Sequence, residues 1–351
     1  MGHSFFEDFW SIKSPQSNEI KRDPHLDALK GFAILLVILG HSIQCSMQNF
    51  DDNLLFRVIY SFHMPLFMFL SGYLAWNKDI NLRRKFMALV VPFVAWHLLN
   101  YVIIPSNQSI GFGTYIMRWI KSPDYGLWFL WVLFINFCIL FAVQRSAGVV
   151  GDKAESLTLL ATVFFLQLLP INVLGLGLVK WHFIFFGAGY YISGAKERYV
   201  TSWKYLSRIS IVCFPLLALT WYRAHGPSFE GSMNNLFNSM SIPGAPLLLF
   251  AYRFVVPFLG IAFAFSLIPS SGKTRLYSML TFLGIITMDI YVVHQNLLFG
   301  FGTGMWKATS AFAIALALSV LVSFILRKSK LLSLVFLGRK IRQQEFVSGM
   351  A

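Results

Sequence analysis

The amino-acid sequence predicts an all-α polytopic membrane protein, a bundle of ten transmembrane helices with both termini in the cytoplasm. The first observation behind this prediction is composition: the 351 residues are 56% hydrophobic and 13% charged, whereas soluble domains are about 45–50% apolar and about 25% charged. The second is the grouping of the apolar residues into runs long enough to cross a bilayer. The third is the concentration of lysine and arginine in alternate connections between those runs.

A transmembrane helix needs about 20 mostly apolar residues, and ten such segments follow one another along the chain. Short polar connections separate most of them, a tight turn near Leu174 and Gly175 separates the fifth from the sixth, and segments 105–126 and 223–245 are longer. In chain order, the expected spans are residues 29–48, 55–76, 86–104, 127–144, 157–174, 177–193, 205–222, 246–268, 277–299 and 308–326.

The positive charges indicate the orientation of these spans. If the N-terminus is cytoplasmic, 22 of the 29 lysine and arginine residues lie in cytoplasmic segments and 6 on the other side, with Arg253 inside a span. Cytoplasmic loops of membrane proteins carry such an excess, so both termini are expected inside. The same short clusters account for the net charge of +14, and we expect no nucleic-acid partner.

One domain is expected over residues 1–351, with a cytoplasmic segment at 1–27 and a basic cytoplasmic tail at 327–351. The first 26 residues have no apolar stretch and no cleavage site typical of removable signal peptides. In the tail, residues 327–342 place the apolar run LLSLVF between basic residues, which favours a helix held by anionic lipid. The 3 cysteines are scattered among apolar segments, so neither a disulfide framework nor a metal site is expected.

Ionisable side chains at membrane depth are costly, which makes them candidates for function. A neutral histidine is the cheapest of them to bury, so at each histidine a structural role competes with a functional one. Arg253 and Asp289 lie in adjacent spans and are expected to pair, while Tyr291 and His294 share one face of a helix. The full set is His41, His63, His97, His182, Arg253, Asp289 and His294.

Two shorter stretches have recognisable local chemistry. FHMPLFMFLSGYL, residues 62–74, contains a proline inside a span and a Ser-Gly pair that allows another helix to approach closely. LRRKF, residues 82–86, places Arg83, Arg84 and Lys85 at the cytoplasmic entrance of the third span. This cluster either sets the membrane orientation or binds phosphate groups that arrive from the cytoplasm.

Five stretches, taken in order, resemble the signature regions of acyltransferase family 3, bacterial inner-membrane enzymes that O-acetylate sugars. The resemblance implies ten transmembrane helices with cytoplasmic ends and a location in the inner membrane. It also implies transfer of acetyl, or another acyl group, from cytoplasmic acetyl-CoA to a hydroxyl of a surface polysaccharide, a lipid-linked glycan or its precursor, without a metal. The stretches are LDALKGFAILLVILGH (26–41), FHMPLFMFLSGYL (62–74), RRKFMALVVPF (83–93), LWFL (127–130) and FLGIITMDIYVVHQ (282–295).

The resemblance implies roles for individual residues. The first-helix motif of the family is an arginine, ten residues and a histidine; here His41 is that histidine, and Lys30 stands at the arginine position. A lysine still attracts a phosphate, but as a point charge without a bidentate fork. His294 matches the late histidine, and Thr287 stands where a serine is usual. The basic cluster of the third helix corresponds to Arg83, Arg84 and Lys85.

These implied roles give a mechanistic hypothesis. A sugar hydroxyl must lose a proton as it attacks the thioester carbonyl, and a neutral imidazole suits that task, so His41 is expected to act as general base. Lys30 and the 83–85 cluster would attract the phosphates of coenzyme A. At about 1.5 Å per residue, Lys30 and His41 lie about 16 Å apart along the helix, a distance that the pantetheine arm could bridge. Transfer through an acyl-histidine is the alternative route.

The other buried polar residues are expected to orient the acceptor or support the fold. These are Tyr291, Asp289, Arg253 and His63, while His294 is a second catalytic candidate. A transporter or flippase for a glycan or lipid-linked precursor is the rival function, because ionisable residues at membrane depth also mark transport pathways. A membrane scaffold or sensor is the third, but it leaves the buried histidines unexplained. The expected partners are membrane lipid and a glycan or lipid-linked sugar acceptor.

Overall fold

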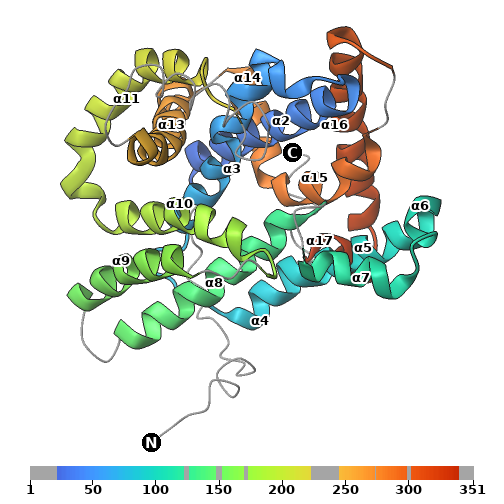
Figure 1. The fold of residues 1–351 in the computed structure, drawn as a ribbon, viewed down its shortest axis with the longest axis horizontal. Coiled ribbons are helices and arrows are strands. Elements are labelled where there is room, and N and C mark those ends of the chain that lie inside the picture. Colours follow the sequence, from blue (N-terminus) through green and yellow to red (C-terminus); the bar gives the residue numbers. More distant parts are fainter. Residues whose placement is uncertain are drawn as a thin grey trace, which may run out of the picture. The chain divides into compact units, whose positions relative to one another are not determined.

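The computed structural model describes residues 22–121, 126–147, 152–169, 173–222, 245–272, 274–298 and 302–339, most of which are helical (Figure 1). No strand occurs in these ranges, which confirms the all-α prediction. The helices are α2 (Pro24–Ser46), the 3-10 helix η1 (Phe50–Asp52), α3 (Leu54–Tyr73), α4 (Leu82–Lys85), the π-helix η2 (Phe86–Val90), α5 (Val91–Ile103), α6 (Pro105–Gln108), α7 (Phe112–Lys121), α8 (Trp128–Ala147), α9 (Asp152–Leu168), α10 (Leu176–Gly194), α11 (Lys196–Ala218), α13 (Ala245–Leu267), α14 (Arg275–Ile285), α15 (Thr287–His294), the 3-10 helix η3 (Gln295–Leu297), α16 (Met305–Arg327) and α17 (Lys330–Leu337).

The described residues divide into two compact units, each assembled from segments that are distant in sequence. The α2–α3 unit is formed by described residues of Arg22–Trp76 and Ala188–Ser319. The α5–α8 unit is formed by described residues of Asn77–Gly187 and Val320–Ala351. One boundary, between Trp76 and Asn77, follows α3, and the other two fall inside α10 and α16, so each of these two helices contributes residues to both units.

Helices overlap all ten of the ranges in which spans are expected. Within the described residues, five helices are long and apolar enough to cross a membrane, and the bent pair of α14 and α15–η3 would make a sixth. The five are Pro24–Ser46, Leu54–Tyr73, Leu82–Ile103, Trp128–Ser146 and Met305–Arg327. These apolar helices support a membrane protein, whereas the count of ten spans and the cytoplasmic position of both termini stay predictions.

The first helix of the α2–α3 unit starts at a well-formed cap and packs tightly. The Asp23 side chain accepts a hydrogen bond from the His25 amide at 2.9 Å, and Pro24 occupies the first turn, where a missing amide hydrogen costs nothing. Further along, a Cβ at Gly31 would clash with the Leu280 carbonyl, and a Cβ at Gly284 would clash with the Asp27 carbonyl. α2 and α14 therefore meet backbone to backbone, which only glycine permits.

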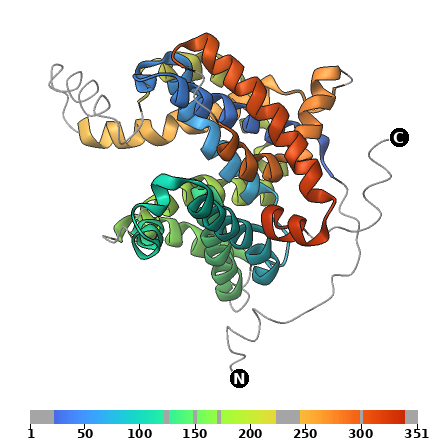
Figure 2. The same ribbon diagram turned by 90° about the vertical axis from the view of Figure 1, so that its right-hand side faces the viewer.

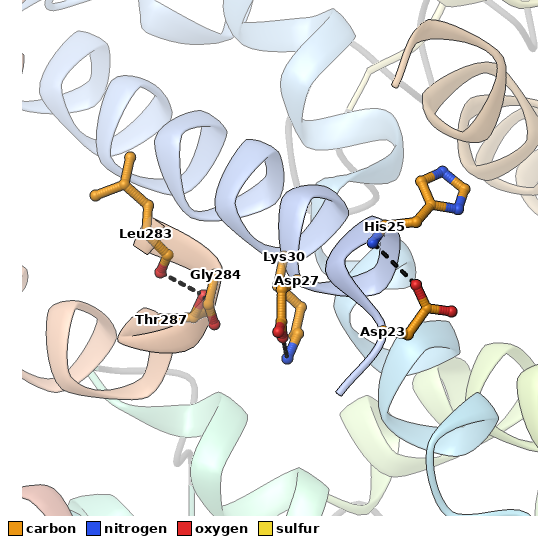
Figure 3. Close-up of polar contacts among 7 residues, drawn as sticks. All are labelled: Asp23, His25, Asp27, Lys30, Leu283, Gly284 and Thr287. Atoms are coloured by element: carbon orange, nitrogen blue, oxygen red, sulfur yellow. Dashed lines mark hydrogen bonds and ion pairs between the residues drawn. The ribbon is translucent and has the colours of Figure 1, made fainter. Parts of the chain in front are cut away.

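The expected span 277–299 is not one straight helix. It breaks at Ile286 into α14 and the α15–η3 segment, which are inclined by 71°. A break frees backbone carbonyls at the end of the first helix, and the Thr287 hydroxyl donates to two of them, those of Leu283 and Gly284, both at 2.9 Å (Figure 3). The threonine therefore has a structural role at the break, and residues 277–299 stay a predicted span whose helix is bent.

The third expected span contains a π-helical turn. In the α5–α8 unit, η2 joins α4 to α5 immediately before Pro92. A proline ring clashes with the carbonyl four residues earlier, here that of Ala88, and the wider π turn lets the helix continue past it. Gly338, with φ of 65°, lies against this segment, and a Cβ there would clash with the Ala88 carbonyl.

The tail forms a short helix that packs on protein. α17 follows α16 after a turn (Figure 2), and the Trp96 indole on α5 donates a hydrogen bond to the Phe336 carbonyl at 2.9 Å. Ser333 and Leu337 are buried, whereas Leu331 is 68% exposed. The expected tail helix thus has one face on α5 and another left open, and the remainder of the predicted tail, residues 340–351, lies outside the described residues.

Candidate active site

Two histidines from opposite ends of the sequence meet inside the α2–α3 unit. His41 lies in the last two turns of α2, and His294 is the final residue of α15; their ring centroids are 5.5 Å apart, with the rings inclined by 36°. α14 packs along α2, and α15 beyond the break also contacts α2. The two residues that sequence reasoning named as catalytic therefore share one site.

The His41 ring meets two polar side chains that sequence reasoning missed. His41 Nδ1 lies 3.2 Å from Gln44 Oε1 and 3.4 Å from the Tyr60 hydroxyl. The same hydroxyl donates a hydrogen bond to Gln44 Oε1 at 3.2 Å. A signal for both was available, because Gln44 is three residues after His41 and Tyr60 three residues before His63, spacings that share a helix face.

The Tyr60 ring is held in place by its neighbours. It stacks on Phe56 with a centroid separation of 3.9 Å and stands edge-on to His63 at 4.8 Å. On α2, a Cβ at Gly40 would lie 2.8 Å from Tyr60 Cε2, so the absence of a side chain at Gly40 makes room for the ring. His63, predicted as a supporting residue, contacts Tyr60 in this way.

His294 has one satisfied nitrogen and one without a partner. Its Nδ1 lies 2.7 Å from the Tyr291 carbonyl and 3.2 Å from the Ile290 carbonyl. Carbonyl oxygens only accept hydrogen bonds, so Nδ1 carries the proton and Nε2 holds a lone pair. The residue is 1% exposed, and within the described part of the chain its Nε2 has no hydrogen-bond partner. Such a buried acceptor is poised to bind a hydroxyl donor.

The other three buried histidines are bonded to their own helices. His63, His97 and His182 each direct Nδ1 to the carbonyl four residues earlier, at 2.7, 2.8 and 2.8 Å. In the α5–α8 unit, the His97 ring packs edge-on against Trp119 and the His182 ring lies beside Trp128. These contacts fit a structural role for His97 and His182.

Lys30 is paired with a carboxylate. Its ammonium forms an ion pair of 2.5 Å with Asp27, whose side chain is 9% exposed (Figure 3). Sequence reasoning missed Asp27, although its position three residues before Lys30 predicts such a pair. Figure 3 shows this pair beside Gly284 and Thr287, at the point where α14 ends. A phosphate at Lys30 would have to compete with a carboxylate already present.

The basic cluster of the third span belongs to the α5–α8 unit. Arg83 and Arg84 are exposed, whereas Lys85 is half-buried and places its ammonium 3.6 Å from the centroid of the Phe137 ring. A cation over an aromatic face is stabilised by the ring quadrupole. Lys85 is therefore partly committed to packing, and the two arginines are the exposed residues of the cluster.

The remaining predicted residues are distributed over α13 and α15. Asp289 is fully buried and Arg253 partly buried, and their pairing stays a prediction. Tyr291 is buried beside His294, with ring centroids 5.6 Å apart, and supplies the carbonyl that His294 bonds. No group of three or more histidine, cysteine, aspartate or glutamate side chains suited to a metal occurs among the described residues.

Comparison with known proteins bears on this arrangement. A family model described as an acyltransferase domain matches residues 23–328, a range that contains α2, α3, α14, α15 and both site histidines. The chain belongs to acyltransferase family 3. This confirms the resemblance seen in the five sequence stretches.

Two relatives carry the name nodulation protein NolL. The one from Sinorhizobium fredii (strain NBRC 101917 / NGR234) is 27% identical over 215 residues, which cover 56% of each chain. The one from Mesorhizobium japonicum (strain LMG 29417 / CECT 9101 / MAFF 303099) is 30% identical over 218 residues, covering 55% of each. The chain thus spans about half the length of these curated relatives. No solved structure matches it.

Proposed function

We propose that the protein is a membrane-bound O-acyltransferase of the bacterial inner membrane. It moves acetyl from cytoplasmic acetyl-CoA to a hydroxyl of a surface polysaccharide, a lipid-linked glycan or its sugar precursor. The observation that carries this proposal is the meeting of His41 and His294, 253 positions apart in the chain, with ring centroids 5.5 Å apart. Membership of an acyltransferase family supports the same chemistry.

His41 is the general base in this reaction. As the acceptor hydroxyl attacks the thioester carbonyl carbon, its proton passes to the imidazole, and a tetrahedral intermediate forms. Collapse of that intermediate breaks the carbon–sulfur bond, and the departing thiolate takes the proton from the imidazolium to give free coenzyme A. One imidazole thus serves as base and then as acid, and such proton transfer contributes about 10²–10⁴-fold to rates.

His294 binds the acceptor hydroxyl and does not act as the general base. Its Nδ1–H is committed to backbone carbonyls, so the buried Nε2 lone pair can accept a hydrogen bond but cannot donate one. An unsatisfied buried acceptor costs about 1–3 kcal/mol, and a substrate hydroxyl would offset that cost. Because the ring is adjacent to His41, a hydroxyl bound there lies within the same site as the base.

The donor is held by cations. Within the α5–α8 unit, Arg83, Arg84 and Lys85 are proposed as phosphate ligands for acetyl-CoA, and the exposure of Arg83 and Arg84 supports their part in this. Within the α2–α3 unit, Lys30 is proposed by itself as a phosphate ligand. Arginine forms bidentate hydrogen bonds with phosphate oxygens. Lys30 contributes less charge than an isolated lysine, because Asp27 neutralises it.

A transporter or flippase is the second candidate. The 71° break between α14 and α15 favours it, because discontinuous helices form substrate sites in many transporters. Purified protein supplied with acetyl-labelled acetyl-CoA and with glycans extracted from cells lacking the gene separates the two functions. The acyltransferase releases free coenzyme A and labels the glycan only when both substrates are present. A flippase does neither, and that result would reject the proposal.

A further inference from the structure

The transfer reaction leaves Gln44 and Tyr60, the two polar side chains against His41, without a role. We propose that Gln44, held by Tyr60, is a positioning residue that fixes the His41 proton on Nδ1 and so directs the Nε2 lone pair to the acceptor hydroxyl. This inference rests on the proposed function of His41 as base.

The tautomer follows from the donors and acceptors around Gln44 Oε1. The Tyr60 hydroxyl already donates to that oxygen at 3.2 Å, and an amide oxygen can only accept. If His41 Nδ1 were unprotonated, its lone pair would face the lone pairs of Oε1 across 3.2 Å, which is repulsive. The Tyr60 hydroxyl, 3.4 Å from Nδ1, could donate to that lone pair only by giving up its shorter bond to Gln44. With the proton on Nδ1, His41 donates to Gln44 and the second lone pair of the oxygen is used.

His41, which is partly buried, differs here from three fully buried histidines. His63, His97 and His182 fix the same tautomer with a carbonyl of their own helix, which moves with the ring. His41 uses a side chain whose amide oxygen is in turn fixed by a residue on α3. The position of the base is therefore set by two helices, α2 and α3.

Tyr60 gives the amide a defined orientation. A glutamine side chain loses up to about 1.5–2 kcal/mol of rotamer freedom when it is ordered, so an unsupported amide would not hold the ring. The hydroxyl that orders it belongs to a ring stacked on Phe56 and packed at Gly40. When His41 accepts the substrate proton at Nε2, the same amide oxygen stabilises the charged Nδ1–H.

The direct test is the nitrogen NMR spectrum of the full-length protein in detergent, labelled with ¹⁵N-histidine. The His41 signals are assigned by their disappearance in His41→Asn. The expected result is a protonated Nδ1 and an unprotonated Nε2 in the wild type, and a mixture of tautomers in Gln44→Met. A protonated Nε2 in the wild type, or an unchanged His41 spectrum in Gln44→Met, overturns the proposal. This readout does not depend on transferase activity, so the proposed function can fail separately.

A kinetic test applies once transfer is measured. Gln44→Met, which keeps the length of the side chain but removes the oxygen, should lower kcat by about 10–100-fold, by analogy with the orienting partners of metal-bound histidines. Gln44→Glu retains an acceptor oxygen and should recover most of that loss. Equal loss in both variants overturns the positioning role.

The matched control is Gln167→Met, which removes a glutamine-to-carbonyl hydrogen bond of 2.9 Å from α9 in the other unit. It should leave the His41 spectrum and kcat unchanged, and a change equal to that of Gln44→Met contradicts the inference. If Gln44→Met fails to fold, Tyr60→Phe keeps the stacked ring and removes the hydroxyl. It should broaden the His41 tautomer distribution, and an unchanged spectrum there also overturns the inference.

Discussion

Both compact units contain buried histidines, but the hydrogen-bond partners of the histidine rings differ between the two units. In the α5–α8 unit, His97 and His182 each bond their own helix and lie against a tryptophan. In the α2–α3 unit, His41 meets polar side chains from two helices and lies beside His294, whose Nε2 is buried without a partner among the described residues. Burial of a histidine is therefore a weak sign of function, whereas the partners of its two ring nitrogens help to separate a functional role from a structural one.

The cationic side chains of the two units also differ in their surroundings. Lys30, in the α2–α3 unit, is paired with a nearly buried carboxylate. Arg83 and Arg84, in the α5–α8 unit, are exposed. Exposed arginines offer a bidentate fork to a phosphate, whereas Lys30 is a point charge that must give up or share its carboxylate partner. The arginines are therefore expected to contribute more to donor binding than Lys30.

The largest effect is expected from removing the proposed base. His41→Ala should lower the rate of acetyl transfer by about 10²–10⁴-fold, the usual contribution of a general base, while the protein still accumulates in the membrane. The measurement is release of free coenzyme A by purified protein, with the thermal transition in detergent as a check on folding. Substantial activity in a folded variant would remove His41 from the mechanism.

The second effect concerns the acceptor. His294→Phe keeps a planar ring but removes the Nε2 lone pair, and loss of one hydrogen bond of about 1–3 kcal/mol should lower kcat/KM for the glycan by about 5–150-fold. The KM for acetyl-CoA should not change. A rise confined to the acetyl-CoA KM would instead assign His294 to the donor.

Removal of the exposed cations should act on the donor only. The double variant Arg83→Ala/Arg84→Ala should raise the apparent KM for acetyl-CoA by about 10-fold or more, since hydrogen bonds to charged groups are worth about 1.5–3 kcal/mol. Addition of salt should have less effect on the variant than on the wild type. If the donor KM stays the same, the cluster serves membrane orientation alone.

Lys30 and Asp27 allow a sharper contrast between charge pairing and phosphate binding. Lys30→Met leaves the Asp27 carboxylate without its cation and should lower the thermal transition, while Lys30→Met/Asp27→Asn should restore it. If the pair is structural, the KM for acetyl-CoA should rise in Lys30→Met and return to the wild-type value in Lys30→Met/Asp27→Asn. A donor KM that stays high in the double variant despite restored stability would show that Lys30 binds phosphate directly.

The smallest effect is expected in the other unit. His97→Phe removes a bond of 2.8 Å to the Phe93 carbonyl but keeps an aromatic ring beside Trp119. Its transfer rate should stay within about twofold of the wild type, because the change removes a bond within α5 and keeps the aromatic packing around it. A loss of transfer rate as large as that of His41→Ala would contradict the structural role of His97.

Much of the architecture follows from the sequence because apolar length and charge distribution are local properties. The positions of the helices could be predicted in this way, and His41 and His294 could be chosen as candidates because they stand in recognisable motifs. The break at Ile286 could not, because it depends on Gly284 meeting the Asp27 carbonyl and on the Thr287 hydroxyl. The first contact is made only after α2 and α14 have packed, and the second is local but forms only where the helix is already broken.

The partners of the site residues were also beyond sequence reasoning. Gln44 and Tyr60 are ordinary residues in apolar helices until α3 packs on α2 and brings the hydroxyl to the amide. The Lys30–Asp27 pair, by contrast, is separated by one helical turn and could have been predicted from its spacing. Sequence patterns therefore locate single candidate residues better than the contacts that surround them.

The most direct test of the central claim compares the surface and lipid-linked glycans of three strains by mass spectrometry. One strain lacks the gene, the second carries the wild-type gene, and the third carries His41→Ala at an equal protein level in the membrane. We expect an O-acetyl group on a glycan of the second strain only. The same O-acetyl group at the same level in the His41→Ala strain, or no difference between the first two strains, would contradict it.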